Sequence, residues 1–206
     1  MDKGFLIVAE GIDGAGKSSQ LKKLAENLRV SGHDVVELRE PTNGTWGQKI
    51  RRLLTEGRDG ITPEEELSYF NNDRREDVAL NIQPALERKA IVLIDRYYYS
   101  TAAYQGALGF DPEAICQENE TFAPRPDLVL MFSIDPEVGL ERISSSRDGF
   151  SSFEKLDYLK RVQAIFNTFE GLHIKRIDAN REMDEVQQDV QNCVSAFLKT
   201  GEIKRK

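Results

Sequence analysis

A glycine-rich segment close to the amino terminus carries one lysine and one serine in a spacing that suits phosphate binding. Residues 11–18 read GIDGAGKS and match the pattern G-x-x-x-x-G-K-[ST]. Glycines let successive backbone N–H groups turn toward one phosphate, Lys17 adds a mobile positive charge, and the Ser18 hydroxyl is a ligand for Mg²⁺. We therefore expect ATP or GTP to bind here with Mg²⁺. The residues that we assign to the nucleotide are Gly11, Ile12, Asp13, Gly14, Ala15, Gly16, Lys17, Ser18 and Ser19.

An acidic and a basic residue, Asp95 and Arg96, follow the apolar run at residues 90–94. A run without polar alternation is typical of a strand that helices cover on both faces, and ligands of such sheets bind at the carboxyl ends of the strands. Asp95 can hold a water molecule of the Mg²⁺ shell, so Asp95 and Ser18 form the expected metal site. Arg96 can clamp a phosphate with two parallel N–H donors, which a lysine cannot do.

The elements that must position these residues alternate along the chain. Short apolar runs predict strands at residues 5–9, 34–38, 90–94, 128–132 and 173–177. Helices are predicted at residues 17–30, 46–55, 63–87, 100–108, 136–144, 153–170 and 182–199. Strand followed by helix, repeated, predicts a three-layer α/β fold. Pro84 lies inside the longest helical stretch and either kinks it or separates two helices.

Length and composition exclude several classes of protein. The 206 residues fit a single domain over residues 1–206, and the net charge of −7 argues against a surface that grips a nucleic-acid polymer. The apolar runs are far shorter than the roughly 20 residues that span a bilayer, so we expect no membrane segment. Glu10 interrupts the first apolar run before it reaches the length of a signal peptide, which indicates a cytoplasmic protein. Cys116 and Cys193 lack the spacing of a metal site or a CxxC motif and are expected to be free thiols.

Five segments, in this order and spacing, resemble the bacterial thymidylate kinases, a family of P-loop nucleoside monophosphate kinases. They are EGIDGAGKSSQ from Glu10, REPTNGTWGQKIR from Arg39, FNNDR from Phe70, DRYYYSTAAYQG from Asp95 and PRPDLVLMFSIDPEVGLERI from Pro124. The resemblance runs from Gly4 to about Asp178. It implies a P-loop kinase fold with a central five-stranded parallel sheet flanked by helices, and a short lid. It also implies ATP-dependent transfer of a phosphoryl group to dTMP, which gives dTDP, and assembly as a homodimer.

The resemblance places the thymine base between two expected helices. Phe70 and Arg74 lie four residues apart, so they project from one face of a helix. Phe70 can stack on the base while Arg74 donates to the exocyclic O4. Thr101 and Gln105 have the same spacing one turn after Arg96, and they can face the N3 edge of the base.

The remaining expected acceptor residues lie near the sugar and the phosphate. Asp13 is similar to the family's acid between the donor and acceptor sites, and Glu40 to the acid beside the acceptor phosphate and its cation. Tyr104 matches the tyrosine whose ring crowds the 2′ position of the sugar, and Tyr97 is assigned to the same site. The expected acceptor residues are Glu40, Phe70, Arg74, Arg96, Tyr97, Thr101, Tyr104 and Gln105, and the expected catalytic residues are Asp13, Lys17, Arg96 and Arg147.

The match weakens over the lid, about residues 142–154, where the family carries arginines that close over the transferred group. The family pattern R-x-x-x-R-G followed by D-R-x-E here reads RISSSRDGFSSFE, with two serines in place of Asp-Arg. The P-loop has no arginine after Asp13, which resembles the subgroup that keeps its catalytic arginine in the lid. We expect Arg147 to be that residue, because the Asp-Gly pair beside it favours a loop tip. Arg142 is expected to contact the nucleotide from the helix before the lid.

Three other functions stay open on the sequence alone. The first is phosphorylation of another nucleoside monophosphate, because base choice depends on few side chains. The second is nucleotide binding without turnover, which the altered lid motivates. The third is a P-loop switch ATPase or GTPase, although N/T-K-x-D and D-x-x-G motifs in the order that a GTPase needs are not found.

Overall fold

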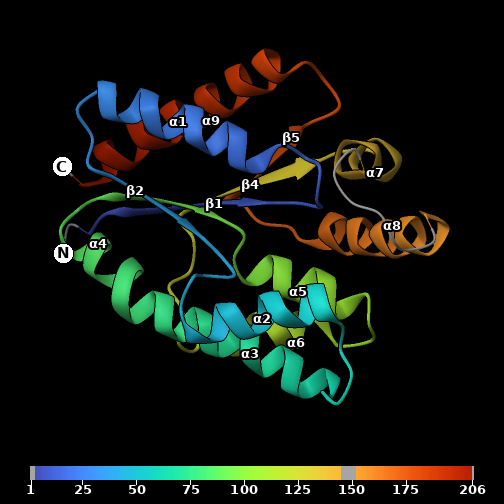
Figure 1. Cartoon of the computed structure of the whole chain (residues 1–206). Coiled ribbons are helices and arrows are strands. Elements are labelled where there is room, and N and C mark those ends of the chain that lie inside the picture. The colour runs from blue at the N-terminus through green and yellow to red at the C-terminus, as the bar shows by residue number, and fades with distance from the viewer. Residues whose placement is uncertain (1–2, 145–151, 206) are drawn as a thin grey trace.

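The chain builds one parallel sheet of five strands in the order β2-β3-β1-β4-β5 (Figure 1). The computed structural model describes residues 3–144 and 152–205. The strands are β1 Phe5–Glu10, β2 Val35–Arg39, β3 Ile91–Asp95, β4 Leu128–Ser133 and β5 Ile174–Asp178. In the register of the central strands, Ala9 pairs with Asp95 of β3 and with Leu130 of β4. The ends of β1 and β3 therefore lie side by side at one edge of the sheet.

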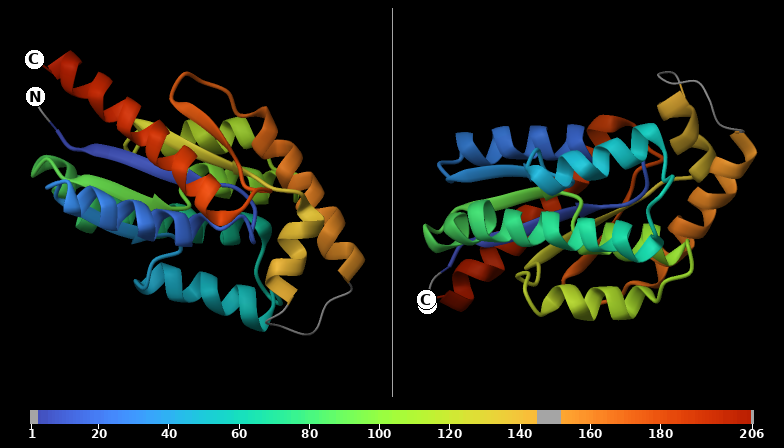
Figure 2. Two further views of the ribbon diagram at one scale, coloured as in Figure 1. Left: turned by 90° about the horizontal axis from the view of Figure 1, so that it is seen from above. Right: turned by 60° about the horizontal axis from the view of Figure 1, so that its bottom comes forward.

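Helices cover both faces of this sheet. The helical elements are α1 Lys17–Val30, α2 Thr45–Glu56, α3 Pro63–Asp77, η1 Val78–Ile82, α4 Gln83–Glu87, α5 Tyr98–Gly106, α6 Pro112–Glu120, α7 Pro136–Ser144, α8 Ser152–Thr168 and α9 Met183–Arg205. In Figure 1, α1 and α9 lie together on one face, and α3, α5 and α6 lie on the other. Figure 2 shows α7 and α8 side by side at the end toward which the strands run. The three-layer α/β architecture expected from the sequence is confirmed.

The core follows from this layering. Every residue of β3 is buried, and so are Leu6–Glu10 of β1, because helices cover both faces of the central strands. The edge strand β2 alternates between covered and exposed residues. Leu21, Leu24 and Leu28 form the buried face of α1, as its amphipathic pattern predicts.

Apart from shifts at the ends of helices and strands, the structure differs from the expected elements in two features. The single helix expected over residues 63–87 consists of α3, one π-helical turn and α4, with Pro84 near the start of α4. Proline has no N–H to donate within a helix, and the wider turn before it bonds the Gln83 N–H to the Val78 carbonyl instead. The helix α6 was not expected. Its N-terminal cap is Asp111, whose carboxylate accepts from the backbone N–H groups of Glu113 and Ala114. Pro112 occupies the first helical position, where its missing N–H costs no hydrogen bond.

Among the described residues, no helix combines the length and the apolar composition needed to cross a bilayer. Cys116 and Cys193 are free thiols, as expected.

Candidate active site

The P-loop connects β1 to α1 and approaches neighbouring backbone closely. Gly11 and Gly14 have φ angles of 138° and 82°. A methyl group on Gly11 would lie 2.3 Å from the Phe132 carbonyl oxygen, and one on Gly14 would lie 2.3 Å from the Gly139 carbonyl oxygen. Any side chain at these positions would force the loop away from β4 and α7. The glycines of the motif therefore position the loop as well as exposing its N–H groups.

Lys17 is buried at the start of α1 with its ammonium group inside the loop. Its Nζ donates to the Gly11 carbonyl over 3.0 Å and to the Ile12 carbonyl over 2.9 Å. Burial, together with the positive charge of Arg96, lowers the pKa of Lys17 to about 7. A polyphosphate beside this group would favour the charged form again, so the site is electrostatically suited to an anion.

The two residues expected to hold the metal lie in contact. The Ser18 hydroxyl donates to Asp95 Oδ2 at the end of β3. Asp95 is buried, and its Oδ1 has no hydrogen-bond partner among the described residues. A buried carboxylate oxygen without a partner, next to a hydroxyl, is a donor set that Mg²⁺ accepts. A cavity of about 110 Å³ lies here, lined by Asp13, Gly14, Gly16, Lys17, Ser18, Ser19, Arg39, Asp95 and Arg96.

Arg39 belongs to this cavity, although it was not among the residues expected there. It ends β2 opposite Asp95 in the parallel register, and its Nε lies 4.0 Å from Asp95 Oδ2. The sequence carried the signal, because the last residues of neighbouring parallel strands meet at one edge of the sheet.

Arg96 reaches from the end of β3 back across the P-loop. Its φ angle is 71°, and its N–H donates to the Ala9 carbonyl over 3.0 Å. The guanidinium lies 2.7 Å from Asp13 Oδ1 and 2.9 Å from the Ser100 hydroxyl oxygen. Partial burial raises the pKa of the Asp13 carboxyl, but the charges of Arg96 and Lys17 outweigh it and hold the pKa below its ordinary value. Asp13 is therefore an ionised partner that orients Arg96.

Glu10 is linked to Arg96 through Ser100 and was not predicted to belong to the site. It is fully buried, and its carboxylate accepts from the Tyr97 N–H over 2.9 Å and from the Ser100 hydroxyl over 2.5 Å. Burial raises the pKa of Glu10 to about 7. Because Ser100 bonds both Glu10 and Arg96, the buried acid fixes the hydroxyl that the guanidinium contacts. The sequence offered one sign of this role, because an acidic residue at the last position of a buried apolar strand lies where ligands bind.

Tyr104 lies against Asp13 on the other side of Arg96. The backbone N–H of Asp13 donates to the Tyr104 hydroxyl over 3.2 Å, and Arg96 donates to it over 3.3 Å. The Tyr158 hydroxyl of α8 donates to the Tyr104 backbone carbonyl over 2.9 Å. The helix α8 thus contacts α5, the helix that carries Tyr104.

Every residue expected to bind the acceptor lines one cavity of about 150 Å³ between α3 and α5. These residues are Glu40, Phe70, Arg74, Arg96, Tyr97, Thr101, Tyr104 and Gln105. Asp13, Pro41, Leu54, Arg58, Glu66, Ser100 and Tyr158 complete the lining and were not expected there, apart from Asp13 at the border of the two sites. We call this space the base cavity.

Arg74 is the central charge of the base cavity and is 1% exposed. It donates to Glu40 Oε2 over 2.5 Å, to the Thr101 hydroxyl over 3.0 Å and to Asn119 Oδ1 over 2.6 Å. Burial raises the pKa of Glu40, against the opposing charge of Arg74. The Tyr97 ring is fully buried with its centroid 5.1 Å from the guanidinium carbon, so it supports Arg74 from behind.

Comparison with known proteins agrees with this geometry. A family model described as thymidylate kinase matches residues 9–190. The chain belongs to the thymidylate kinase family. The "Thymidylate kinase" of Desulfotalea psychrophila is 52% identical over 95% of this chain and 96% of its own length. The "Thymidylate kinase" of Akkermansia muciniphila is 44% identical over 94% and 92%, and the "Probable thymidylate kinase" of Archaeoglobus fulgidus is 40% identical over 94% and 96%. The resemblance seen in the sequence is confirmed, and so is the P-loop kinase fold that it implies.

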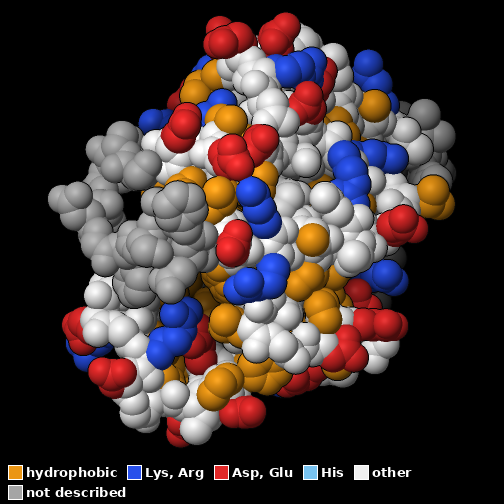
Figure 3. All heavy atoms as spheres, turned by 90° about the vertical axis from the view of Figure 1, so that its right-hand side faces the viewer, with side chains coloured by type: hydrophobic (Ala, Val, Ile, Leu, Met, Phe, Trp, Pro, Cys, Tyr) orange, Lys and Arg blue, Asp and Glu red, His pale blue; other side chains and the backbone are white. Residues whose placement is uncertain are grey.

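The structure describes only the borders of the segment that is expected to be the lid in this thymidylate kinase family member. Arg142, on α7, lies 3.4 Å from the carbonyl oxygens of Gly14 and Ala179, so it is at the rim of the P-loop. Arg147 lies outside the described residues. On the side of the molecule that carries α7 and α8, Lys and Arg side chains are interspersed with Asp and Glu (Figure 3).

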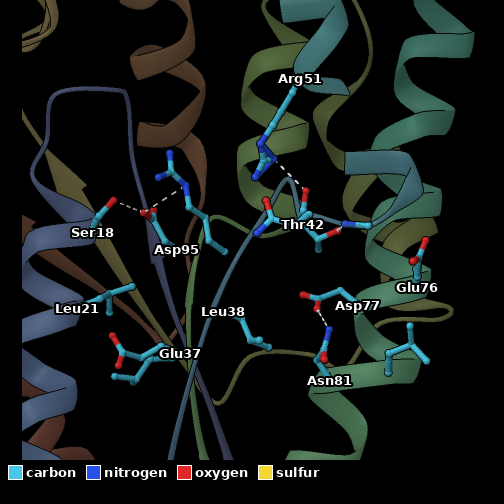
Figure 4. Close-up of a pocket in the computed structure, with 15 residues that line it drawn as sticks. Ser18, Leu21, Glu37, Leu38, Thr42, Arg51, Glu76, Asp77, Asn81 and Asp95 are labelled. Carbon is cyan, nitrogen blue, oxygen red and sulfur yellow. Dashed lines mark hydrogen bonds and ion pairs between the residues drawn. The ribbon is translucent and has the colours of Figure 1, made fainter. Parts of the chain in front are cut away.

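A larger cavity of about 750 Å³ adjoins the site. Ser18 and Asp95 form one end of it, and Thr42, Arg51 and Asp77 lie around the other (Figure 4). Two consecutive parts of the loop after β2 face different cavities. Residues 40–41 line the base cavity, and residues 42–44 line the larger one. In this thymidylate kinase family member, the loop after β2 therefore lies between the base cavity and the larger cavity.

Proposed function

We propose that the chain transfers the γ-phosphoryl group of ATP to dTMP and releases ADP and dTDP. One observation carries the proposal: Asp13 and Arg96 line both the phosphate cavity at the P-loop and the base cavity. A monophosphate whose base lies between α3 and α5 therefore brings its phosphate to Arg96, on the side where the P-loop holds the donor. Membership of the thymidylate kinase family supports ATP as donor and dTMP as acceptor.

The roles of the side chains follow from what phosphoryl transfer requires. The transferred group spreads negative charge over its oxygens, so the protein acts by positioning and by neutralising charge. The loop N–H groups and Lys17 hold the donor phosphates. Arg96, oriented by Asp13 and Ser100, holds the acceptor phosphate in line with them. Arg147 completes the positive cage from the lid, and Arg142 contacts the nucleotide at the P-loop rim.

We propose that Ser18 and Asp95 hold Mg²⁺ together with the nucleotide. The unpartnered Oδ1 of Asp95 fits this role, since a buried carboxylate oxygen without a donor is costly unless a ligand satisfies it. Bound Mg²⁺ supplies positive charge to the phosphate oxygens.

The acceptor contacts proposed are stacking and edge recognition. Phe70 stacks on the base, while Arg74, Thr101 and Gln105 face its polar edge. Tyr104 packs beside the sugar. Its hydroxyl is held by the backbone N–H of Asp13, which lies where the two cavities meet, between the base and the phosphates.

The test is ADP release by the purified chain with MgATP and each of dTMP, dUMP, dCMP, dGMP, dAMP and UMP, beside a reaction without acceptor. We expect dTMP to give the highest kcat/KM. A different preferred acceptor contradicts the choice of substrate. ADP release that no monophosphate stimulates contradicts the proposed transfer and favours a nucleotide-binding protein.

We also propose that the chain forms a homodimer, which the family resemblance implies. Sedimentation velocity tests it, with a mass near twice 23.4 kDa expected. A mass near one chain at micromolar concentration contradicts the dimer.

We propose a cytoplasmic location. The free thiols of Cys116 and Cys193 support it, because a reducing compartment keeps thiols unpaired. Cell fractionation is the test, and recovery outside the cytoplasmic fraction contradicts it.

A further inference from the structure

Three polar side chains form a continuous chain along one wall of the base cavity. Glu66, on α3, is 3% exposed, and its carboxylate accepts from Arg58 at both oxygens, over 2.6 Å and 3.0 Å. Gln105, on α5, donates from Nε2 to Glu66 Oε1 over 3.2 Å. Arg58 is half exposed at the rim, whereas Gln105 is buried. The chain therefore runs from solvent to the wall that faces the base.

The chemistry of these groups fixes which way round the Gln105 amide lies. A guanidinium only donates hydrogen bonds, and an ionised carboxylate only accepts them. The amide nitrogen of Gln105 must therefore face Glu66, and its carbonyl must face elsewhere. Gln105 Oε1 is buried and has no hydrogen-bond partner within the part of the chain that the structure describes. It is an unused acceptor in the wall of the base cavity.

We propose that Glu66, held by Arg58, is the positioning residue that makes the acceptor site select a base with an N–H at N3. The inference rests on the proposed transfer to dTMP. Thymine and uracil carry a donor at N3 beside the O4 acceptor, whereas cytosine carries an acceptor at N3 beside an amino group. Gln105 Oε1 accepts from the N3–H. Arg74, whose Nε is also buried and unpartnered, donates to O4.

Cytosine meets the opposite pattern at both atoms. Its N3 faces the Gln105 carbonyl oxygen, so two acceptors meet without a proton between them. Its amino group faces the Arg74 guanidinium, so two donors meet. A buried polar group without a hydrogen-bond partner costs binding free energy, so an amide that cannot turn discriminates strongly against cytosine. If the amide turned freely, Gln105 would present its nitrogen to cytosine and the filter would be lost.

The test removes the fixed acceptor at position 66 without changing the size of the side chain. In Glu66→Gln, Arg58 can no longer bond two acceptors at position 66, because one of the two oxygens becomes an amide nitrogen that only donates. The group that faces Gln105 is then no longer fixed as an acceptor, so the Gln105 amide can turn and present its nitrogen to the base. We expect the ratio of kcat/KM for dTMP to that for dCMP to fall about 10- to 100-fold.

Two comparisons separate this effect from general damage. The ratio for dTMP to dUMP should stay the same, because both bases carry the N3–H. The matched control is Glu64→Gln on the exposed side of the same helix turn, which should leave all three acceptors unchanged.

The double variant Glu66→Gln with Gln105→Glu restores a fixed acceptor toward the base. A carboxylate at position 105 only accepts hydrogen bonds, so it cannot turn a donor toward the base, whichever way the amide at position 66 lies. We expect its ratio for dTMP to dCMP to return to within about threefold of the unmodified chain, which keeps the proposal testable if the single variant unfolds.

Two results overturn the inference: an unchanged dTMP to dCMP ratio in Glu66→Gln, whether activity is kept or falls equally on all three acceptors, or a double variant that does not recover. These results are distinct from failure of the proposed function, which would appear as an unmodified chain that does not phosphorylate dTMP.

Discussion

The Arg96 guanidinium lies 2.7 Å from Asp13 Oδ1, a contact that joins the end of β3 to the P-loop. The same guanidinium contacts Ser100, which Glu10 holds from below. Arg96 is therefore fixed from two sides before any substrate binds. A group that is already in place loses little entropy when the acceptor phosphate arrives.

Removing this guanidinium should reduce catalysis more than folding. We expect Arg96→Ala to lower kcat/KM for dTMP by about 10²- to 10³-fold, the range for loss of one charge-stabilising donor. The control is Arg88→Ala, which removes an exposed arginine paired with Asp34 at 3.0 Å. Steady-state kinetics of both variants is the measurement. A kcat/KM of Arg96→Ala within threefold of that of the unmodified chain would contradict the role of Arg96 at the acceptor phosphate.

Nucleotide binding should take up a proton at Lys17. With a pKa of about 7 in the free protein, Lys17 is largely neutral at pH 8. Bound phosphates restore the charge, so we expect uptake of up to about one proton per ADP at pH 8. Calorimetry in two buffers of different ionisation enthalpy measures it. The Lys17→Met variant should lack the uptake, and equal heats of protonation in both proteins would disprove the prediction.

Glu10 should make stability fall as the pH rises. Its folded pKa of about 7 is above the ordinary value of 4.5, so the folded state holds the proton more tightly. The stabilising contribution is therefore complete below pH 4.5 and is lost as the pH rises through 7. Relative to Glu10→Gln, the free energy of unfolding should fall by about 3 kcal/mol across this window.

Urea unfolding of the two proteins at pH 5 and pH 8 checks this difference. The control is Glu26→Gln on the exposed side of α1, which should show no such dependence. A difference between Glu10→Gln and the unmodified chain that does not change with pH would show that Glu10 ionises as freely as an exposed acid.

Arg142 on α7 and Arg147 in the expected lid should have separable effects. Arg147→Ala should lower kcat by about 10³-fold or more, because a single arginine of this kind has that effect in related P-loop enzymes. Arg142→Ala should mainly raise KM for ATP, since Arg142 lies at the P-loop rim beside Gly14. Kinetics with varied ATP at saturating dTMP distinguishes them, and the reverse pattern would exchange the two roles.

Much of the site could be predicted because its signals are local in the sequence. The pattern G-x-x-x-x-G-K-S fixes backbone geometry over a few residues, and the run before Asp95 marks a strand end. A spacing of four residues brings Arg74 and Phe70 to one cavity. In each case the physical cause acts over one helix turn or one strand.

The missed residues depend on contacts between distant segments. Glu10 meets Ser100 across 90 positions, and Gln105 meets Glu66 across 39. Burial and hydrogen bonding underlie the roles that we propose for Glu10 and Glu66, and neither can be read from a local pattern. The π-helical turn before Pro84 was missed for a related reason, since tertiary packing decides how a helix accommodates a proline.

The backbone conformation of Arg96 lowers the stability of the fold. A left-handed residue other than glycine costs the fold about 1–3 kcal/mol, and the φ of 71° at Arg96 carries that cost. Glycine at this position would relax the chain but remove the guanidinium. Relief of this backbone cost and retention of the guanidinium therefore favour different residues at position 96, and a screen for heat resistance alone could select a variant with lower activity.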